Sequence, residues 1–135
     1  MDNTITVVGN LTREPELRYL PGGQAVCKLG IAVNRRYMKN DEWQEDTSFF
    51  NINCWRGLAE HVAETLAIGY RVIVTGRLQS RSWETEDGQK RTVVEIEADD
   101  IGPSLRWATA TIAKVERHPA WQEEVSPYDQ SGTRG

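Results

Sequence analysis

The sequence has 135 residues, 39% of them hydrophobic and 27% charged, which is the size and composition of one folded domain with a tail. A formal net charge of −4 argues weakly against a polyanionic partner. No apolar run approaches the roughly 20 residues of a membrane-spanning helix. The N-terminus lacks the basic and apolar regions of a signal peptide, so we expect a cytoplasmic protein.

The charges are distributed unevenly along the chain. Residues 13–39 contain six basic and two acidic side chains. Residues 41–46 and 95–100 carry four acidic side chains each and no basic one. This distribution predicts one positive surface, with the negative charge concentrated elsewhere.

The first half of the chain predicts three strands. Residues 4–11 and 25–33 alternate apolar and other side chains, and Pro21-Gly22-Gly23 is a strong turn signal before the second run. A polar stretch at 39–46 precedes the third strand, and we expect a long, mobile loop there. The apolar positions that share a face in the first two runs are Ile5, Val7, Leu11, Cys27, Leu29, Ile31 and Val33.

The second half predicts one helix and two further strands. Residues 57–67 have helical periodicity, and Gly69 suits the position just after a helix. Two β-rich arms then flank the turn signal Asp87-Gly88. An all-β fold with one helix between strands 3 and 4 matches the five-stranded OB-fold barrel. Composition alone does not choose this barrel over another small one.

Aromatic side chains next to arginines are the signal for a binding surface. Along residues 49–55, Phe49 and Trp55 share a face with two asparagines, opposite an apolar face that can fill a barrel. Tyr37 and Trp83 lie at the ends of other strands, each beside arginine. Single-stranded nucleic acids expose base faces to aromatic rings and phosphates to Arg and Lys. Core packing explains any one of these rings, but four of them beside basic residues favour a nucleic-acid surface.

Catalysis and metal binding have little support in the sequence. Cys27 and Cys54 lack metal-ligand spacing and read as buried thiols, with a disulfide between subunits as the alternative. Asp99 and Asp100 are adjacent, so on a strand they point to opposite faces and make a poor metal site. His61 and His118 have no candidate for a catalytic or metal-binding partner nearby in the sequence. We therefore expect no enzyme, cofactor or metal.

Two other functions stay open on this reasoning. A protein-binding OB adaptor would explain the acidic balance but leaves the aromatic residues beside arginine without a role. An RNA-binding OB module is closer, because stacking does not distinguish DNA from RNA and no residue visibly reads a 2′-hydroxyl.

Two long segments make the pattern more specific. GNLTREPELRYLPGGQAVCKLGIAVNRR and VIVTGRLQSRSWETEDGQKRTVVEIEADDIG resemble the bacterial single-stranded DNA-binding protein family over about residues 3–102. The ending DDIGPSLRWATATIAKV resembles actinobacterial members. The resemblance implies single-stranded DNA as partner, in replication, recombination and repair. It also implies a homotetramer, a dimer of dimers, in which DNA wraps around several subunits.

The family's stacking positions fall on aromatic residues of this chain. They are Tyr37, Phe49, Trp55 and Trp83, with Trp43 as an additional contact. The arginines expected to meet phosphates are Arg35, Arg36, Arg56, Arg77 and Arg81.

Three segments are expected along the chain. Residues 1–103 form the OB-fold domain and residues 116–135 a disordered tail. Residues 104–115 form an extra C-terminal strand that pairs either with its own barrel or with a neighbouring subunit, and we favour the neighbour. Family members end in a few Asp residues and Ile-Pro-Phe, which docks repair and replication enzymes. This sequence ends Gln-Ser-Gly-Thr-Arg-Gly, so we expect no docking of that kind, either in a short-tailed paralogue or in a shortened chain.

Overall fold

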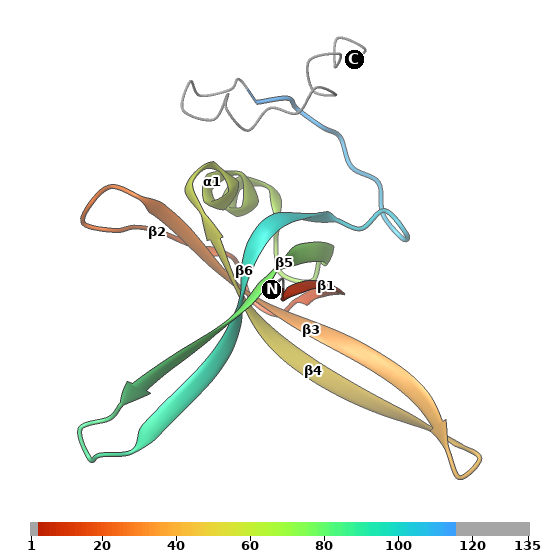
Figure 1. The fold of residues 1–135 in the computed structure, drawn as a ribbon. Coiled ribbons are helices and arrows are strands. Elements are labelled where there is room, and N and C mark those ends of the chain that lie inside the picture. The colour runs from red at the N-terminus through yellow and green to blue at the C-terminus, as the bar shows by residue number, and fades with distance from the viewer. Residues whose placement is uncertain (1–2, 116–135) are drawn as a thin grey trace.

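The computed structural model describes residues 3–115 of the chain, and this part contains six strands and one helix (Figure 1). In chain order they are β1 (Thr4–Leu11), β2 (Glu16–Tyr19), β3 (Ala25–Lys39), β4 (Glu42–Trp55), α1 (Arg56–Thr65), β5 (Arg71–Glu84) and β6 (Lys90–Pro103). No helix within these residues is long and apolar enough to cross a membrane. The expected disordered tail, 116–135, lies outside the described residues.

Five of the strands close into a barrel. In order around it are β1, β5, β6, β4 and β3, and β3 pairs back to β1 at Leu11↔Ile31. Neighbouring strands are antiparallel except β4 and β6, which run parallel around Ile52↔Ile96. The helix α1 lies between the third and fourth barrel strands, β4 and β5. The predicted all-β, five-stranded OB-fold barrel is therefore confirmed.

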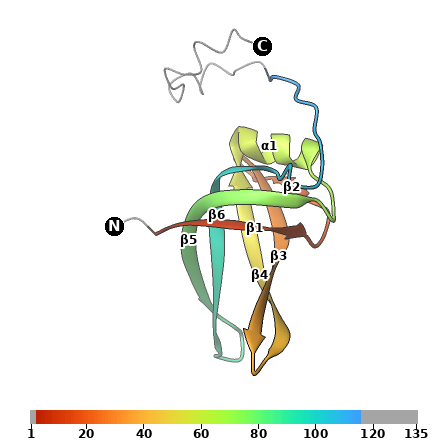
Figure 2. The ribbon, with the colours of Figure 1, turned by 90° about the vertical axis from the view of Figure 1, so that its right-hand side faces the viewer.

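The additional strand of the sheet is β2 and not the segment 104–115. β2 pairs with the start of β3, from Glu16↔Lys28 to Tyr19↔Ala25, around the turn predicted at 21–23. Residues 104–115 are neither strand nor helix, so the expected C-terminal strand is not formed within the single chain. A strand needs an edge to pair with. After β6 the chain first lies beside the start of β5, where Trp107 packs on Arg71, and it pairs with no strand before it leaves the barrel (Figures 1 and 2).

Both long hairpins close through tight turns. β3 and β4 stay paired up to Asn40-Asp41, whose φ angles of 53° and 64° lie in the left-handed region. Asn and Asp tolerate this conformation better than most side chains do, and it matches the twist of the flanking strands. The long loop expected at 39–46 is therefore wrong, because most of these polar residues continue the two strands. The turn predicted at Asp87-Gly88 is confirmed, with Gly88 at a φ of 84°.

The helix α1 covers one end of the barrel (Figure 2). It begins at Arg56 and ends at Thr65, close to the predicted 57–67. Ala59 and Val62 on its inner side are buried in the core. Gly69, with a φ of 89°, lies in the turn that leads into β5 and not directly after the helix, whose C-cap is Leu66.

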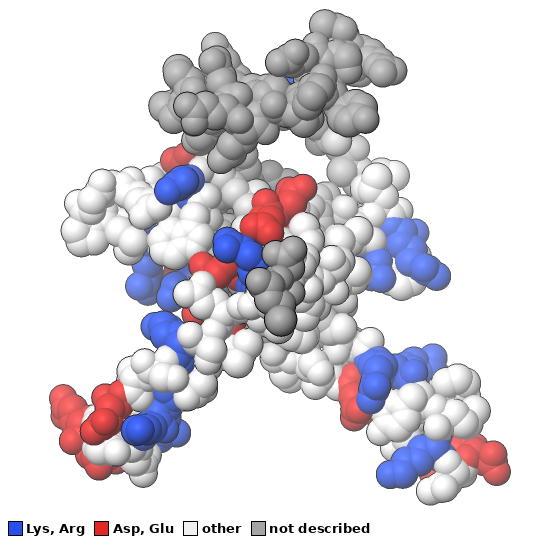
Figure 3. Space-filling view, in the orientation of Figure 1, with Lys and Arg blue, Asp and Glu red and all other residues white. Residues whose placement is uncertain are grey.

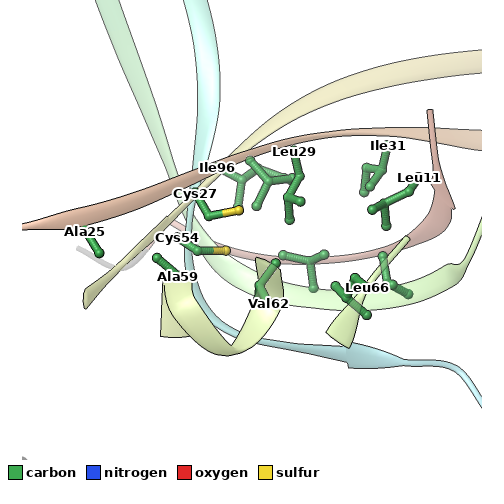
Figure 4. Packing of buried hydrophobic residues seen from close by; sticks show 13 residues of the cluster. Leu11, Ala25, Cys27, Leu29, Ile31, Cys54, Ala59, Val62, Leu66 and Ile96 are labelled. Atoms are coloured by element: carbon green, nitrogen blue, oxygen red, sulfur yellow. The ribbon is translucent and has the colours of Figure 1, made fainter. Parts of the chain in front are cut away.

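Aliphatic side chains and two thiols fill the barrel (Figure 4). Cys27 lies opposite Cys54 in the β3–β4 register, and both are free, fully buried thiols, as predicted. Burial raises the pKa of both, that of Cys54 to about 12, with the adjacent Cys27 as the next cause. At neutral pH both therefore stay protonated and unreactive. Buried inside one barrel, neither presents a sulfur atom for a disulfide with another subunit.

Candidate nucleic-acid interface

Two hairpin arms extend from the barrel on the side away from α1 (Figures 1 and 2). We call the outer parts of β3 and β4, residues 34–47, the β3–β4 arm. The outer parts of β5 and β6, residues 79–94, are the β5–β6 arm. Most side chains of both arms are exposed, because a two-stranded ribbon outside the barrel has no core to cover either face. They are therefore available to a partner.

The β3–β4 arm carries two aromatic rings, each under an arginine. The guanidinium of Arg35 lies 5.0 Å from the ring centroid of Tyr37, and that of Arg36 lies 5.1 Å from the ring centroid of Trp43. Trp43 is 62% exposed. A guanidinium on one face of a ring is a cation–π contact that holds the ring in place and leaves the opposite face for stacking.

The β5–β6 arm repeats this arrangement. Arg81 lies 5.3 Å from the ring centroid of Trp83, whose side chain is about half exposed. A hydrogen bond of 3.0 Å joins the hydroxyls of Ser82 and Thr92 across the two strands. The two arms thus present rings of the same kind in the same arginine-backed form.

Phe49 and Trp55 lie nearer the barrel on β4. Phe49 is 74% exposed beside Ala32 of β3, which is unusual for so large an apolar side chain. Trp55 ends β4 and is half-buried at the start of α1. The structure therefore places Tyr37 and Trp43 on one arm, Trp83 on the other, and Phe49 and Trp55 along β4 as it runs into the barrel.

A cleft of about 790 Å³ opens beside Trp55. Arg56 and Arg77 line it from α1 and β5, together with Gln79 of β5 and Glu97 of β6. Arg56 has a φ of 60°, a conformation that side chains other than glycine rarely adopt. This single left-handed residue turns the chain from strand into helix. Strained residues of this kind gather at binding sites.

Carboxylates lie among the arginines of the interface. Asp46 pairs with Arg35 at 3.1 Å, and Asp99 lies 3.7 Å from Arg77. Glu95 lies 3.6 Å from Arg81 and is largely shielded from solvent. Figure 3 shows basic and acidic side chains mixed on both arms. The prediction that the acidic residues at 41–46 and 95–100 gather elsewhere is therefore wrong, because strand pairing brings them beside the basic ones.

The sequence did not predict that Asn53 and Glu97 would form a hydrogen-bonded group with Trp55 at the interface. Glu97 of β6 accepts hydrogen bonds from the side chains of both Asn53 and Trp55 of β4. The parallel β4–β6 pairing brings them together across more than 40 residues of sequence. No local spacing signals such a contact, so only the topology of the barrel could have indicated it.

Metal ligands are not gathered anywhere in residues 3–115. No three His, Cys, Asp or Glu side chains of this part of the chain are grouped so that they could hold a metal ion. Asp99 and Asp100 illustrate why: Asp99 faces Arg77, whereas Asp100 accepts a hydrogen bond from the backbone N–H of Ile101.

The barrel topology and the exposed arms together define an OB-fold module with a surface of arginine-backed aromatic rings. Such a surface suits stacking against unpaired bases. The Single-strand binding protein family matches residues 2–104 as a family model, and the chain belongs to that family.

Individual relatives agree with this assignment. A single-stranded DNA-binding protein of Mycolicibacterium smegmatis is 55% identical over 86% of this chain and 72% of its own length. One from Mycobacterium tuberculosis is 52% identical over 86% of this chain and 73% of its own length. The crystal structure of a small single-stranded DNA-binding protein from Streptomyces coelicolor is also similar. It has a TM-score of 0.66 and 35% identity, and it covers 78% of this chain and 96% of that one. The resemblance to actinobacterial members is confirmed.

Proposed function

We propose that this chain binds single-stranded DNA with little sequence preference, in replication, recombination and repair, and catalyses no reaction. The observation that carries the proposal is the set of rings backed by arginine on the two arms. Its relatives are named single-stranded DNA-binding proteins, which favours DNA over RNA as the partner. Every base offers a π-face, so a surface of this kind accepts many sequences.

Bases stack in this proposal on four rings, Tyr37, Phe49, Trp55 and Trp83, with Trp43 as an additional contact. Trp43 supplements Tyr37, because both rings lie on the β3–β4 arm under neighbouring arginines. The phosphates meet Arg35, Arg36, Arg56, Arg77 and Arg81. Arg35, Arg77 and Arg81 already have carboxylate partners. At these three arginines a DNA phosphate therefore replaces a carboxylate and not a water molecule.

The nucleic acid that the surface prefers can be measured directly. We expect oligo-dT to quench the tryptophan fluorescence and to bind more tightly than duplex DNA of the same length. The reason is that paired bases are stacked on each other and present no free face to the rings. Titrations with oligo-dT, oligo-U and duplex DNA at one salt concentration decide the point. Tighter binding to oligo-U would indicate an RNA-binding module, and unchanged emission at saturating oligo-dT would contradict stacking on tryptophan.

The phosphate contacts can be counted from the salt dependence. Replacing Arg36 or Arg81 by alanine is expected to reduce the slope of log affinity against log salt by about 0.7 for each phosphate that the variant no longer binds. Arg18→Ala is the matched control, because Arg18 is an exposed arginine paired with Glu16 on β2, away from the arms. Slopes that are the same for all three variants and the parent would place the DNA path elsewhere.

We further propose that the chain assembles as a homotetramer and that residues 104–115 attach each subunit to a neighbour. These residues expose large apolar side chains that their own barrel does not cover. Trp107 is 74% exposed and Ile112 is 88% exposed. A second subunit offers the strand edge and apolar surface that the single chain lacks for this segment.

A further inference from the structure

Glu97 is placed among the proposed DNA contacts although its charge repels phosphate. It lines the cleft beside Trp55 together with Arg56 and Arg77. The two other acidic residues nearby on β6 each pair with an arginine of β5: Asp99 with Arg77, and Glu95 with Arg81. Glu97 instead hydrogen-bonds neutral side chains. Neutralising the charge of an arginine therefore does not explain why a carboxylate lies in this position.

Both carboxylate oxygens of Glu97 accept hydrogen bonds from β4. Oε1 accepts from the indole Nε1–H of Trp55 at 2.8 Å, and Oε2 accepts from Nδ2 of Asn53 at 2.7 Å. Asn53 is buried, and Trp55 and Glu97 are half-buried. Hydrogen bonds to an ionised acceptor are shorter and about twice as strong as those between neutral groups. The indole is therefore held firmly at its edge, and the bond leaves its faces unobstructed.

The backbone brings Glu97 to this position by two features. Asn53 and Glu97 are register partners in the parallel β4–β6 pair. On the other side, Gly76 of β5 packs directly against the backbone carbonyl of Glu97, where any Cβ would collide with it. A β-bulge between Thr75 and Gly76 shifts the register at the same point. Glu97 is thus fixed from both neighbouring strands, which makes it a rigid support for a side chain on β4.

Trp55 needs such a support because nothing in its own backbone fixes the ring. The torsion between the β-carbon and an aromatic ring has a broad energy profile, so the plane of an indole swings unless a contact holds it. Fixing a side chain during binding lowers affinity, and a ring that is already fixed avoids this loss. A hydrogen bond at the Nε1 edge sets the plane of the ring before DNA arrives.

We infer that Glu97 is a positioning residue, whose carboxylate sets the plane of the Trp55 indole for stacking against a base. This inference rests on the proposed function, since it assumes that Trp55 stacks on DNA. It assigns to an acidic residue a favourable role in binding a polyanion. It also separates two roles of the acidic residues on β6: Glu95 and Asp99 pair with arginines, whereas Glu97 orients an aromatic ring.

Two substitutions of Glu97 separate positioning from charge. Glu97→Gln removes the charge but keeps the length, so its amide oxygen still reaches the indole N–H. Glu97→Asp keeps the charge but is shorter by one methylene group and loses that reach. If Glu97 positions the ring, Glu97→Gln binds oligo-dT about two- to twelvefold more tightly than Glu97→Asp, the range that corresponds to fixing one side chain. It also keeps the indole N–H resonance of Trp55 downfield, whereas Glu97→Asp shifts that resonance upfield.

The resonance is read in protein labelled with ¹⁵N-tryptophan and is assigned by its loss in Trp55→Phe. That variant also completes a double-mutant cycle: without an indole N–H, the advantage of Glu97→Gln over Glu97→Asp should shrink to the part that comes from the difference in charge. Glu64→Asp, on the exposed side of α1, is the control for shortening a glutamate and is expected to bind like the parent. Far-UV circular dichroism verifies that every variant is folded.

The outcomes distinguish this inference from the proposed function. Equal affinities for Glu97→Gln and Glu97→Asp, with the same indole resonance, would overturn the positioning role while leaving stacking intact. A difference between them that is equally large in the Trp55→Phe background would overturn it as well. If Trp55→Ala binds oligo-dT as tightly as the parent, it is the stacking of Trp55 itself that fails.

Discussion

Replacing Trp83 by alanine is expected to weaken oligo-dT binding by about 1–3 kcal/mol, roughly five- to 150-fold. Trp83 stands exposed on the β5–β6 arm with Arg81 against one face, so its removal deletes a stacking surface and leaves the guanidinium without its ring. Trp55→Ala should have an effect of the same size. Fluorescence anisotropy of a labelled oligo-dT at fixed salt measures both.

A matched control separates stacking from mere exposure of an aromatic ring. Tyr19 is 59% exposed, more than Trp83 at 47%, but it lies on β2 and donates a hydrogen bond to Glu60 of α1. Tyr19→Ala should therefore bind oligo-dT like the parent, and Trp83→Phe should retain most of the affinity. Parental affinity in Trp83→Ala would contradict the proposed path of DNA over the β5–β6 arm.

Removing the residues after Ser104 is expected to divide the proposed tetramer and to lower the melting temperature. Leu105, Trp107 and Ile112 are exposed in the single chain, and their burial against a neighbour would supply the hydrophobic contribution that this truncation deletes. Cutting after Ser104 keeps its hydroxyl bonded to Arg71 at 2.5 Å, so the end of β6 stays anchored. Mass measured by light scattering and the midpoint of thermal unfolding report the two effects.

A second truncation, after Val115, is the control for shortening the chain. It keeps the apolar segment 104–115 and should retain the number of subunits and the melting temperature of the full chain. Trp107→Ala tests the proposed contact with a neighbour without a truncation, because Trp107 is 74% exposed in the single chain. An equal number of subunits and an equal melting temperature for the full chain and the Ser104 truncation would refute attachment through this segment.

Local sequence patterns predicted the barrel because they reflect local physics. Alternation in residues 25–33 identifies the face that carries Leu29 and Ile31, and both are fully buried. Helical periodicity and Gly69 located α1 to within two residues at each end. The same alternation along β4 separated the buried Ile52 from the exposed Phe49. Each of these signals depends only on neighbours along the chain.

The parts that could not be predicted depend on pairing between distant segments. The contacts of Asp46 and Glu95 with arginines follow from strand register, which residue counts along the chain do not reveal. The Asn40-Asp41 turn looked like the centre of a loop because its polar neighbours face water on both sides of an arm. Glu97 became informative only when the parallel β4–β6 pair brought it to Trp55.

The parallel β4–β6 pair also has a consequence for the newly synthesised chain. β6 is the last strand of residues 3–115, yet it lies between β4 and β5 in the barrel. A chain that has not yet released β6 from the ribosome therefore lacks the carboxylate that holds Trp55 and the acidic partners of Arg77 and Arg81. Barrels closed by such non-local pairs fold in about milliseconds to seconds. The complete surface therefore forms only after synthesis has passed residue 103, so a chain that still lacks β6 cannot present it to DNA.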